Sequence, residues 1–189
     1  KAPMVYVNTV GAQDEIIFDG GSSAIDAKGK TLAQSVFFEE DLNVVDFATG
    51  VGGFRDVPED KAEKTRRALV LGLRDFSRKT GIQKMHLGLS GGIDSAVVAC
   101  LAVDALGPNR VTGVTMPGPF NEPRSKSLSE KLAKNLGIRC LDIPIGPAYE
   151  AVVSSFEASV GKAEFGVVNE NMQARLRGLF LMSLSNKEG

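Results

Sequence analysis

A run of glycines and hydroxyl side chains lies near the middle of the sequence, where residues 85–98 have the pattern of a strand, a tight turn and a helix start. Gly91 and Gly92 lack Cβ atoms, so the backbone there can adopt open conformations and bring its N–H groups close to a ligand. Ser90 and Ser95 add hydroxyl donors. The helix start adds unpaired N–H groups and the positive end of the helix dipole. Together these features predict a phosphate-binding turn.

This turn carries a carboxylate and no lysine. In the usual nucleotide P-loop a Gly-Lys-Ser/Thr sequence follows the glycines, whereas here Asp94 stands in the loop. A bare carboxylate repels phosphate, so Asp94 is either the N-cap of the helix or a ligand of a Mg2+ ion that bridges it to the phosphates. The competing structural interpretation is a tight turn with an N-cap and no ligand.

The elements around the turn predict an α/β fold with a parallel, Rossmann-like sheet. A helix over 58–80, which Gly81 ends, precedes a regular alternation of strand 84–89, helix 94–106, strand 110–116, helix 125–136 and strand 138–143. Strands that alternate with helices form a parallel sheet that is covered on both faces. Right-handed crossovers place the carboxyl ends of the strands at one edge, where ligands bind.

A second loop is expected at the same edge. Residues 115–120 contain prolines and a glycine directly after a strand, so this segment leaves the sheet and exposes Met116 and the last strand carbonyls. Those carbonyls could bind an adenine edge while Met116 packs on the ring. The alternative is that Met116 is a plain core residue.

A helix near the C-terminal end of the sequence could offer polar groups to a ligand. At 100° per residue Asn171, Arg175, Gly178 and Met182 share one narrow face, and an apolar set shares another: Met172, Leu176, Leu179 and Phe180. A guanidinium can bind phosphate or carboxylate with two hydrogen bonds. A solvated helix face is the alternative. Arg177 lies on a different face and is the weaker candidate.

The first fifty residues read as a β-meander. Short segments rich in β-branched and aromatic residues are separated by Gly, Asp and Ser: 4–10, 15–18, 23–26, 33–38 and 43–47. We interpret Asp14, Glu15 and Asp19 as turn residues and solvated strand ends, because no nucleophile is available for them to serve as an acid–base pair. Residues 49–57 are the predicted linker to the helix that follows Pro58.

Composition limits the class of protein. The 189 residues are 43% hydrophobic and 24% charged, with a formal net charge of -1, which argues against a broad nucleic-acid surface. No apolar run is long enough to span a membrane, and the N-terminus lacks the features of a signal peptide. Cys100 and Cys140 are expected as buried thiols in a reducing compartment, so we expect a cytoplasmic protein. Because Lys1 opens on strand-like sequence, we expect the chain to begin inside something larger.

The glycine turn, read as Ser90-Gly91-Gly92-Ile93-Asp94-Ser95, resembles the SGGxDS signature of the PP-loop ATP pyrophosphatases. The resemblance narrows further, because residues 169–177 match the NENxQARxR pattern of NAD synthetases. Residues 6–22 are similar to the last part of the nitrilase-like glutaminase domain of the glutamine-dependent members. The resemblance implies an adenine nucleotide alpha hydrolase-like sheet. It also implies three regions: the end of a nitrilase-like α/β domain (1–48), the linker (49–57) and the N-terminal part of a synthetase domain (58–189).

The resemblance also implies a reaction. ATP adenylates the nicotinate carboxylate of deamido-NAD+ and releases pyrophosphate, after which ammonia, derived from glutamine, displaces AMP to give NAD+. It assigns deamido-NAD+ to Asn171 and Arg175, Mg2+ to Asp94, and ATP to Gly88, Leu89, Ser90, Gly91, Gly92, Ile93, Asp94, Ser95 and Met116. No catalytic side chain is assigned, since neither cysteine matches the glutaminase nucleophile. A homo-oligomer is expected.

Two alternatives stay open. The chain could belong to another PP-loop enzyme, such as a nucleotide amidotransferase or a tRNA-modifying enzyme, or it could be a truncated fragment that only associates with a partner copy. The Gly-Asn-Lys-Ser-Glu motif of the family, which should follow Asn186, does not occur before Gly189. Turnover by this chain alone is therefore an open question. His86, the only histidine, is interpreted as structural and not as a catalytic base.

Overall fold

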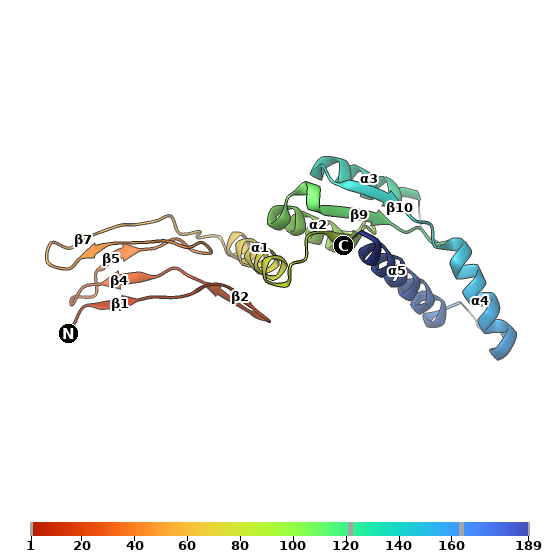
Figure 1. Ribbon diagram of the computed structural model, residues 1–189, viewed down its shortest axis with the longest axis horizontal. Coiled ribbons are helices and arrows are strands. Elements are labelled where there is room, and N and C mark those ends of the chain that lie inside the picture. Colours follow the sequence, from red (N-terminus) through yellow and green to blue (C-terminus); the bar gives the residue numbers. More distant parts are fainter. Residues whose placement is uncertain (1, 121–122, 163–164, 189) are drawn as a thin grey trace. The chain divides into compact units, whose positions relative to one another are not determined.

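The computed structural model describes residues 2–120, 123–162 and 165–188, and the chain divides into two compact units, Lys1–Gly81 and Ile82–Gly189 (Figure 1). The first unit contains short antiparallel strands and one helix. The second unit contains a parallel sheet with helices. Within the described ranges, no helix combines the length and the apolar character needed to cross a membrane.

The strands of the first unit form three small antiparallel groups. A three-stranded sheet has the order β1-β4-β5, β2 pairs with β3, and β6 pairs with β7. Their bounds are β1 Met4–Tyr6, β2 Val10–Gln13, β3 Ile16–Asp19, β4 Ser23–Ile25, β5 Thr31–Gln34, β6 Val45–Asp46 and β7 Val51–Gly52. The prediction that this region consists of short strands is therefore confirmed, although the strands are shorter and more numerous than predicted.

The first predicted strand, 4–10, is wrong in its extent. It divides at Asn8, whose side-chain amide donates to Asp19 Oδ1 at 2.8 Å and to the Gly20 carbonyl at 3.0 Å. These bonds turn the chain from one sheet into the β2–β3 pair. That pair is joined by Asp14 and Glu15, with Asp14 at a φ of 52°, so the interpretation of these residues as a turn is confirmed.

Helix α1 (Lys61–Thr80) packs on β2 and β3. It begins three residues later than predicted, because Asp60 is its N-cap and accepts a hydrogen bond from the Glu63 amide at 2.8 Å. Gly81, at a φ of 75°, ends it as expected. Strand β7 lies inside the segment predicted as a linker. The assignment of 1–48 to a glutaminase domain, 49–57 to a linker and 58–189 to a synthetase domain stays a prediction.

The sheet of the second unit is parallel, as predicted, with the order β10-β9-β8. Its strands are β8 Met85–Gly88, β9 Val111–Thr115 and β10 Arg139–Asp142. Its helices are α2 Ile93–Leu106, the short η1 Pro108–Arg110, α3 Pro123–Leu136, α4 Gly146–Val160 and α5 Val167–Glu188. Because β8, β9 and β10 run in one direction, their carboxyl ends meet at one edge.

Two apolar clusters cover the two faces of this sheet. On one face Leu87, Leu89 and Val111 pack with alanines of α2 and with Ala133 of α3. On the other face Val114 and Met116 pack with Ile145 and with Phe180, Leu181 and Leu184 of α5. The alternation of Val111 and Val114 between the clusters follows from the period of two along a strand. The expected two-sided cover is thus confirmed.

Two details of the second unit differ from expectation. Helix α4 was not predicted, because its first residues, Gly146 and Pro147, are typical of a loop, and among its described residues only Tyr149 is buried. The prediction that Cys100 is a buried thiol is wrong. Helix α2 turns Ala99 and Ala102 toward the sheet, which leaves Cys100 exposed, while Cys140 on β10 is partly buried.

Candidate functional site

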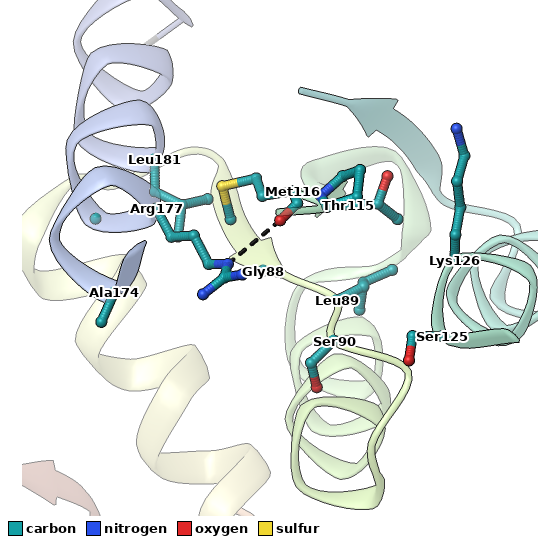
Figure 2. Close-up of a pocket in the computed structure, with 12 residues that line it drawn as sticks. Gly88, Leu89, Ser90, Thr115, Met116, Ser125, Lys126, Ala174, Arg177 and Leu181 are labelled. Carbon is teal, nitrogen blue, oxygen red and sulfur yellow. Dashed lines mark hydrogen bonds between the residues drawn. The ribbon is translucent and has the colours of Figure 1, made fainter. Parts of the chain in front are cut away.

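A cavity of about 520 Å³ lies at the carboxyl edge of the parallel sheet, entirely within the second unit (Figure 2). Three groups of residues form its walls: the ends of β8 and β9 with the residues that follow, the first turns of α3, and one face of α5. They are Gly88, Leu89, Ser90, Thr115, Met116, Pro117, Ser125, Lys126, Ala174, Arg177, Gly178 and Leu181. The two loops that the sequence places at one edge are therefore brought together here.

The glycine turn that follows β8 is held in a conformation that only glycine suits. Gly91 has a φ of 78°, and a Cβ built on it would lie 2.6 Å from the carbonyl oxygen of Ser125 in α3. The first turn of α3 therefore packs directly on the backbone of the turn. Four residues further along α3, the buried side chain of Ser129 donates a hydrogen bond to the Leu89 carbonyl at 3.2 Å. Helix α3 thus fixes the position of the turn.

The two serines of the turn form a network of their own. Their hydroxyl oxygens lie 2.9 Å apart, and Ser95 Oγ also accepts from the Ser90 amide at 3.2 Å and donates to the Gly92 carbonyl at 3.1 Å. The Gly92 amide in turn donates to Ser90 Oγ at 3.2 Å. The turn is therefore pre-formed, and its exposed Ser90 and Gly92 remain accessible to a ligand.

Helix α2 begins at this turn with Gly92 as its N-cap, and no side chain caps it. The interpretation of Asp94 as an N-cap is therefore wrong. Asp94 lies in the first helical turn with an exposed side chain. The uncapped amides at this end of the helix, together with the helix dipole, favour an anion.

The interpretation of Met116 as a core residue is confirmed, whereas its packing on an adenine ring stays a prediction. Met116 is 7% exposed and packs with Val114 and Ile145, and it also lines the cavity. Its methyl group is the neighbour of Gly88, where a built Cβ would lie 3.2 Å from Met116 Cε. Its backbone oxygen accepts a hydrogen bond from Arg177 Nε at 3.3 Å.

A small polar network lies beside the cavity at the ends of β9 and β10. Thr115 Oγ1 donates to Asp142 Oδ1 at 2.6 Å, and Lys126 Nζ donates to Asp142 Oδ2 at 2.5 Å. The hydrogen bonds from Lys126 and Thr115 lower the pKa of Asp142, and the bond to Asp142 raises the pKa of Lys126. The positive charge of Lys126 is therefore balanced by a carboxylate.

Helix α5 presents a different face to the cavity than the sequence predicts. Its lining residues are Ala174, Arg177, Gly178 and Leu181, whereas Asn171 and Arg175 are exposed and do not line the cavity. Gly178 is shared between the predicted face and the lining. The predicted roles of Asn171 and Arg175 stay predictions.

Asn169, the first residue of the NENxQARxR pattern, is buried and structural. Its side-chain amide donates to Tyr149 Oη at 2.9 Å, and its Oδ1 accepts from the Gly166 amide at 3.2 Å. It therefore ties the start of α5 to α4. Leu176 is also buried, as the predicted apolar face requires, but Leu179 on that face is 59% exposed.

His86 lies away from the cavity. Its side chain is 3% exposed, and its Nε2 lies 3.4 Å from Glu188 Oε2 near the end of α5. Glu188 also accepts from Arg139 Nη1 at 2.8 Å, so this group joins α5 to β8 and β10. The geometry supports the structural interpretation of His86.

Several lining residues were not identified from the sequence. Ser125, Lys126, Ala174 and Leu181 carry no local signal, because their place in the wall depends on how α3 and α5 pack. Arg177 was identified only as the weaker candidate. Among the described residues no group of three or more His, Cys, Asp or Glu side chains could hold a metal ion. A metal held through one protein carboxylate and a ligand's phosphates needs no such group, which fits Mg2+ at Asp94.

Comparison with known proteins points to one family. The sequence model described as NAD synthase matches residues 65–189. The chain is 42% identical over 194 residues to a glutamine-dependent NAD(+) synthetase of Synechocystis sp., a match that covers 100% of this chain and 35% of the relative. A glutamine-dependent NAD(+) synthetase of Aquifex aeolicus is 39% identical over 220 residues, which cover 97% of this chain and 39% of the relative. The chain thus spans little more than a third of the length of these curated relatives.

Solved structures agree with this similarity. A glutamine-dependent NAD+ synthetase from Acinetobacter baumannii in complex with ADP superposes with a TM-score of 0.91 and 34% identity, over 99% of this chain and 36% of that one. An NMN synthetase from Francisella tularensis superposes with a TM-score of 0.62 and 32% identity, over 68% of this chain and 52% of that one.

Proposed function

Since the chain belongs to the NAD synthase family, we propose that it carries the ATP-binding site of an enzyme that amidates deamido-NAD+ to NAD+. In the proposed reaction ATP adenylates the nicotinate carboxylate and pyrophosphate leaves. Ammonia, which the full-length enzyme obtains from glutamine, then displaces AMP. The observation that supports this proposal most is the cavity at the sheet edge beside a pre-formed glycine turn without lysine.

The glycine turn would bind the phosphates. The amides at the start of α2, which no side chain caps, would donate to an anion without reorganisation, whereas Ser90 would turn its hydroxyl proton from Ser95 Oγ toward the phosphates. Fixed donors stabilise charge that develops on a leaving group better than mobile water does. The proposed phosphate-contacting segment is Gly88 to Ser95, with Leu89 and Ile93 contributing backbone only.

Asp94 would hold Mg2+ together with the phosphates. Its side chain is exposed at the first turn of α2, where a carboxylate can reach a ligand in the turn. When bound, the ion supplies positive charge that neutralises the phosphate oxygens and makes pyrophosphate a better leaving group. This role would explain why a carboxylate stands beside a phosphate-binding turn, where a bare carboxylate would repel the phosphates.

The adenine would lie against Met116. The Met116 side chain forms part of the cavity wall, and its thioether can pack on a ring. Asn171 and Arg175, which are exposed on α5, would bind deamido-NAD+. A guanidinium at this place suits a substrate that carries both a pyrophosphate and a carboxylate. We further propose that residues 1–48 belong to a nitrilase-like glutaminase domain and that the enzyme is a homo-oligomer.

A binding comparison tests the choice of substrate. In the presence of ATP and Mg2+, the melting temperature of the chain is measured with deamido-NAD+, nicotinate mononucleotide and xanthosine monophosphate. We expect the largest rise with deamido-NAD+. Stabilisation by xanthosine monophosphate alone would favour another PP-loop amidotransferase, and a preference for nicotinate mononucleotide would favour an NMN synthetase.

A turnover assay tests the reaction itself. Pyrophosphate release is followed with ATP, deamido-NAD+ and ammonia, for this chain and for the full-length protein that contains it. We expect release by the full-length protein that depends on deamido-NAD+ and is lost in Asp94→Asn. Release by the full-length protein without any release by this chain would assign the chain a binding role only.

A further inference from the structure

Helix α3 begins beside the glycine turn, and two of its side chains attach it to the sheet. Lys126 donates to the carboxylate of Asp142, the last residue of β10, and Ser129 donates to the carbonyl of Leu89, directly after β8. Lys126 and Ser129 are three residues apart, so they are neighbours on one face of the helix. The two bonds therefore fix the rotation of α3 about its axis as well as its distance from the sheet.

The carboxylate of Asp142 is itself held by the sheet. Its Oδ1 accepts from Thr115 Oγ1 at 2.6 Å, and Thr115 is the last residue of β9. Its Oδ2 accepts from Lys126 Nζ at 2.5 Å. This hydrogen bond lowers the pKa of Asp142 and raises the pKa of Lys126, so both groups are charged at neutral pH. One oxygen of the carboxylate thus binds a strand, and the other binds the helix.

Lys126 belongs to the cavity wall, but its ammonium group does not face the glycine turn. Figure 2 shows its side chain extending away from Ser90 and Ser125. Asp142 holds the ammonium in this direction. The lysine of a P-loop reaches the phosphates themselves. In the arrangement seen here, Lys126 can act on a nucleotide only through the position of α3.

The backbone of Ser125, next to Lys126, is the part of α3 that packs on the turn. Its Cα and its carbonyl oxygen lie 2.8 Å and 2.6 Å from a Cβ built on Gly91. Gly92, the N-cap of α2, follows directly in the sequence. A shift of the first turn of α3 would therefore change the direction of the amides that are proposed to meet the phosphates.

We infer that the ion pair of Lys126 and Asp142 positions the phosphate-binding turn, because it holds the first turn of α3 against Gly91 before a nucleotide arrives. This inference rests on the proposed function, since it assumes that the turn receives the phosphates of ATP. Lys126 and Asp142 are then positioning residues, and neither contacts the nucleotide. Their side chains are 42% and 37% exposed, and a partly exposed ion pair contributes little free energy, which limits the effect on binding to about fivefold.

The test measures dissociation constants of the chain for adenosine and ADP by calorimetry, with Lys126→Met, Asp142→Asn and the double variant. We expect each single substitution to weaken ADP by about two- to fivefold and adenosine by less than about 1.5-fold, because the turn would contact only phosphates. The double variant should match the single variants and not the product of their effects, because either substitution breaks the same pair. Lys126→Arg should keep most of the affinity, since a guanidinium also pairs with a carboxylate.

Lys131→Met is the matched control, because Lys131 is an exposed cation on the same helix. It should leave the affinities for adenosine and ADP unchanged. Weaker ADP binding in Lys131→Met by the same factor as in Lys126→Met would show that only the net charge of α3 matters, which overturns the inference.

Three further results would also overturn it. Weaker ADP binding in Lys126→Met but not in Asp142→Asn would show that Lys126 binds phosphate directly. Equal weakening of adenosine and ADP would show that the pair supports the whole unit and not the turn. Unchanged ADP affinity in all variants would show that the pair positions nothing. Failure of the unaltered chain to bind ADP would instead contradict the proposed function, so the two failures are distinguishable.

Discussion

Gly91 is the residue on which the geometry of the candidate site most depends. Its positive φ and the Ser125 oxygen 2.6 Å from a built Cβ act together, because either one alone would disfavour a side chain. The backbone of Ser125 cannot move away without shifting α3. Any substitution must therefore distort the turn, the helix or both.

We predict that Gly91→Ala lowers the stability of the second unit by about 2 kcal/mol or more and weakens ADP binding at least tenfold. The measurements are urea denaturation and calorimetry. Gly137→Ala is the control, since Gly137 also has a positive φ of 67° but its built Cβ meets nothing closer than 4.0 Å. The control should lose only about 1 kcal/mol of stability, the cost of placing alanine at a positive φ, and should keep its ADP affinity. Equal effects of the two substitutions would contradict the role of the Ser125 contact.

Gly88 sets the space beside Met116 in the cavity. Here φ is not positive, and a built Cβ lies 3.2 Å from Met116 Cε, the end of a flexible side chain. We therefore predict that Gly88→Ala folds normally, with a melting temperature within about 2 °C, but weakens adenosine and ADP by a similar factor because Met116 shifts into the cavity. Unchanged adenosine binding would place the adenine elsewhere.

At the scale of elements, the side chain of Asp75 connects α1 to β2 in the first unit. Its side chain is 5% exposed, and Oδ2 accepts from the Ala12 amide of β2 at 2.8 Å. Lys79 and Arg78 also contact this carboxylate, at 2.8 Å and 2.6 Å. The buried Ala12 amide of β2 thus depends on the carboxylate of Asp75 for a hydrogen-bond acceptor.

We predict that Asp75→Ala destabilises the first unit by about 1 to 3 kcal/mol, because the Ala12 amide loses its partner in a buried position. Hydrogen exchange at the Ala12 amide reports this loss directly. Glu63→Ala on the same helix is the matched control, since Glu63 also contacts two arginines but lies at the surface. Exchange at Ala12 should be unchanged in the control, and faster exchange there would contradict the assignment.

The hydrogen bonds and ion pairs of Asp75 also make the stability of the first unit depend on pH. Hydrogen bonds from Lys79, from the Ala12 amide and from Arg78 hold the pKa of Asp75 well below its usual range. A lowered folded-state pKa stabilises the fold fully above the unfolded value of about 4, and this contribution declines as the pH falls below it. We predict a steeper loss of stability below about pH 4 for the unaltered chain than for Asp75→Asn. Parallel pH profiles of the urea midpoint would contradict this.

At the scale of the whole molecule, the two units should respond differently to nucleotide. All lining residues of the cavity lie in Ile82–Gly189, so we expect ADP to bind this unit alone. We predict that saturating ADP, at about 100 times its dissociation constant, stabilises this unit by about 2.7 kcal/mol and slows exchange of the β8 and β9 amides. The β4 and β5 amides of the first unit should exchange at an unchanged rate. Equal protection of both units would show that they unfold together.

The sequence by itself determined the order of elements in the second unit, the glycine turn and the chemistry that it offers. These features are local: hydrophobic periodicity, adjacent glycines and a carboxylate in place of a lysine can be recognised without knowing what packs against them. The parallel sheet followed from them through general rules of chain connection, and the structure confirms it. The boundaries of the short strands in the first unit did not follow, because side-chain bonds such as those of Asn8 decide where each strand ends.

Only the tertiary structure decided which residues form the wall of the cavity. Asn171 and Arg175 share a helix face, but the rotation of α5 about its axis is set by the burial of Phe180, Leu181 and Leu184 against the sheet. That rotation turns Arg177 toward Met116 and leaves Arg175 at the surface. Ser125 and Lys126 reach the site only because α3 packs on Gly91. Periodicity gives the faces of a helix, whereas long-range packing decides which of these faces lines the cavity.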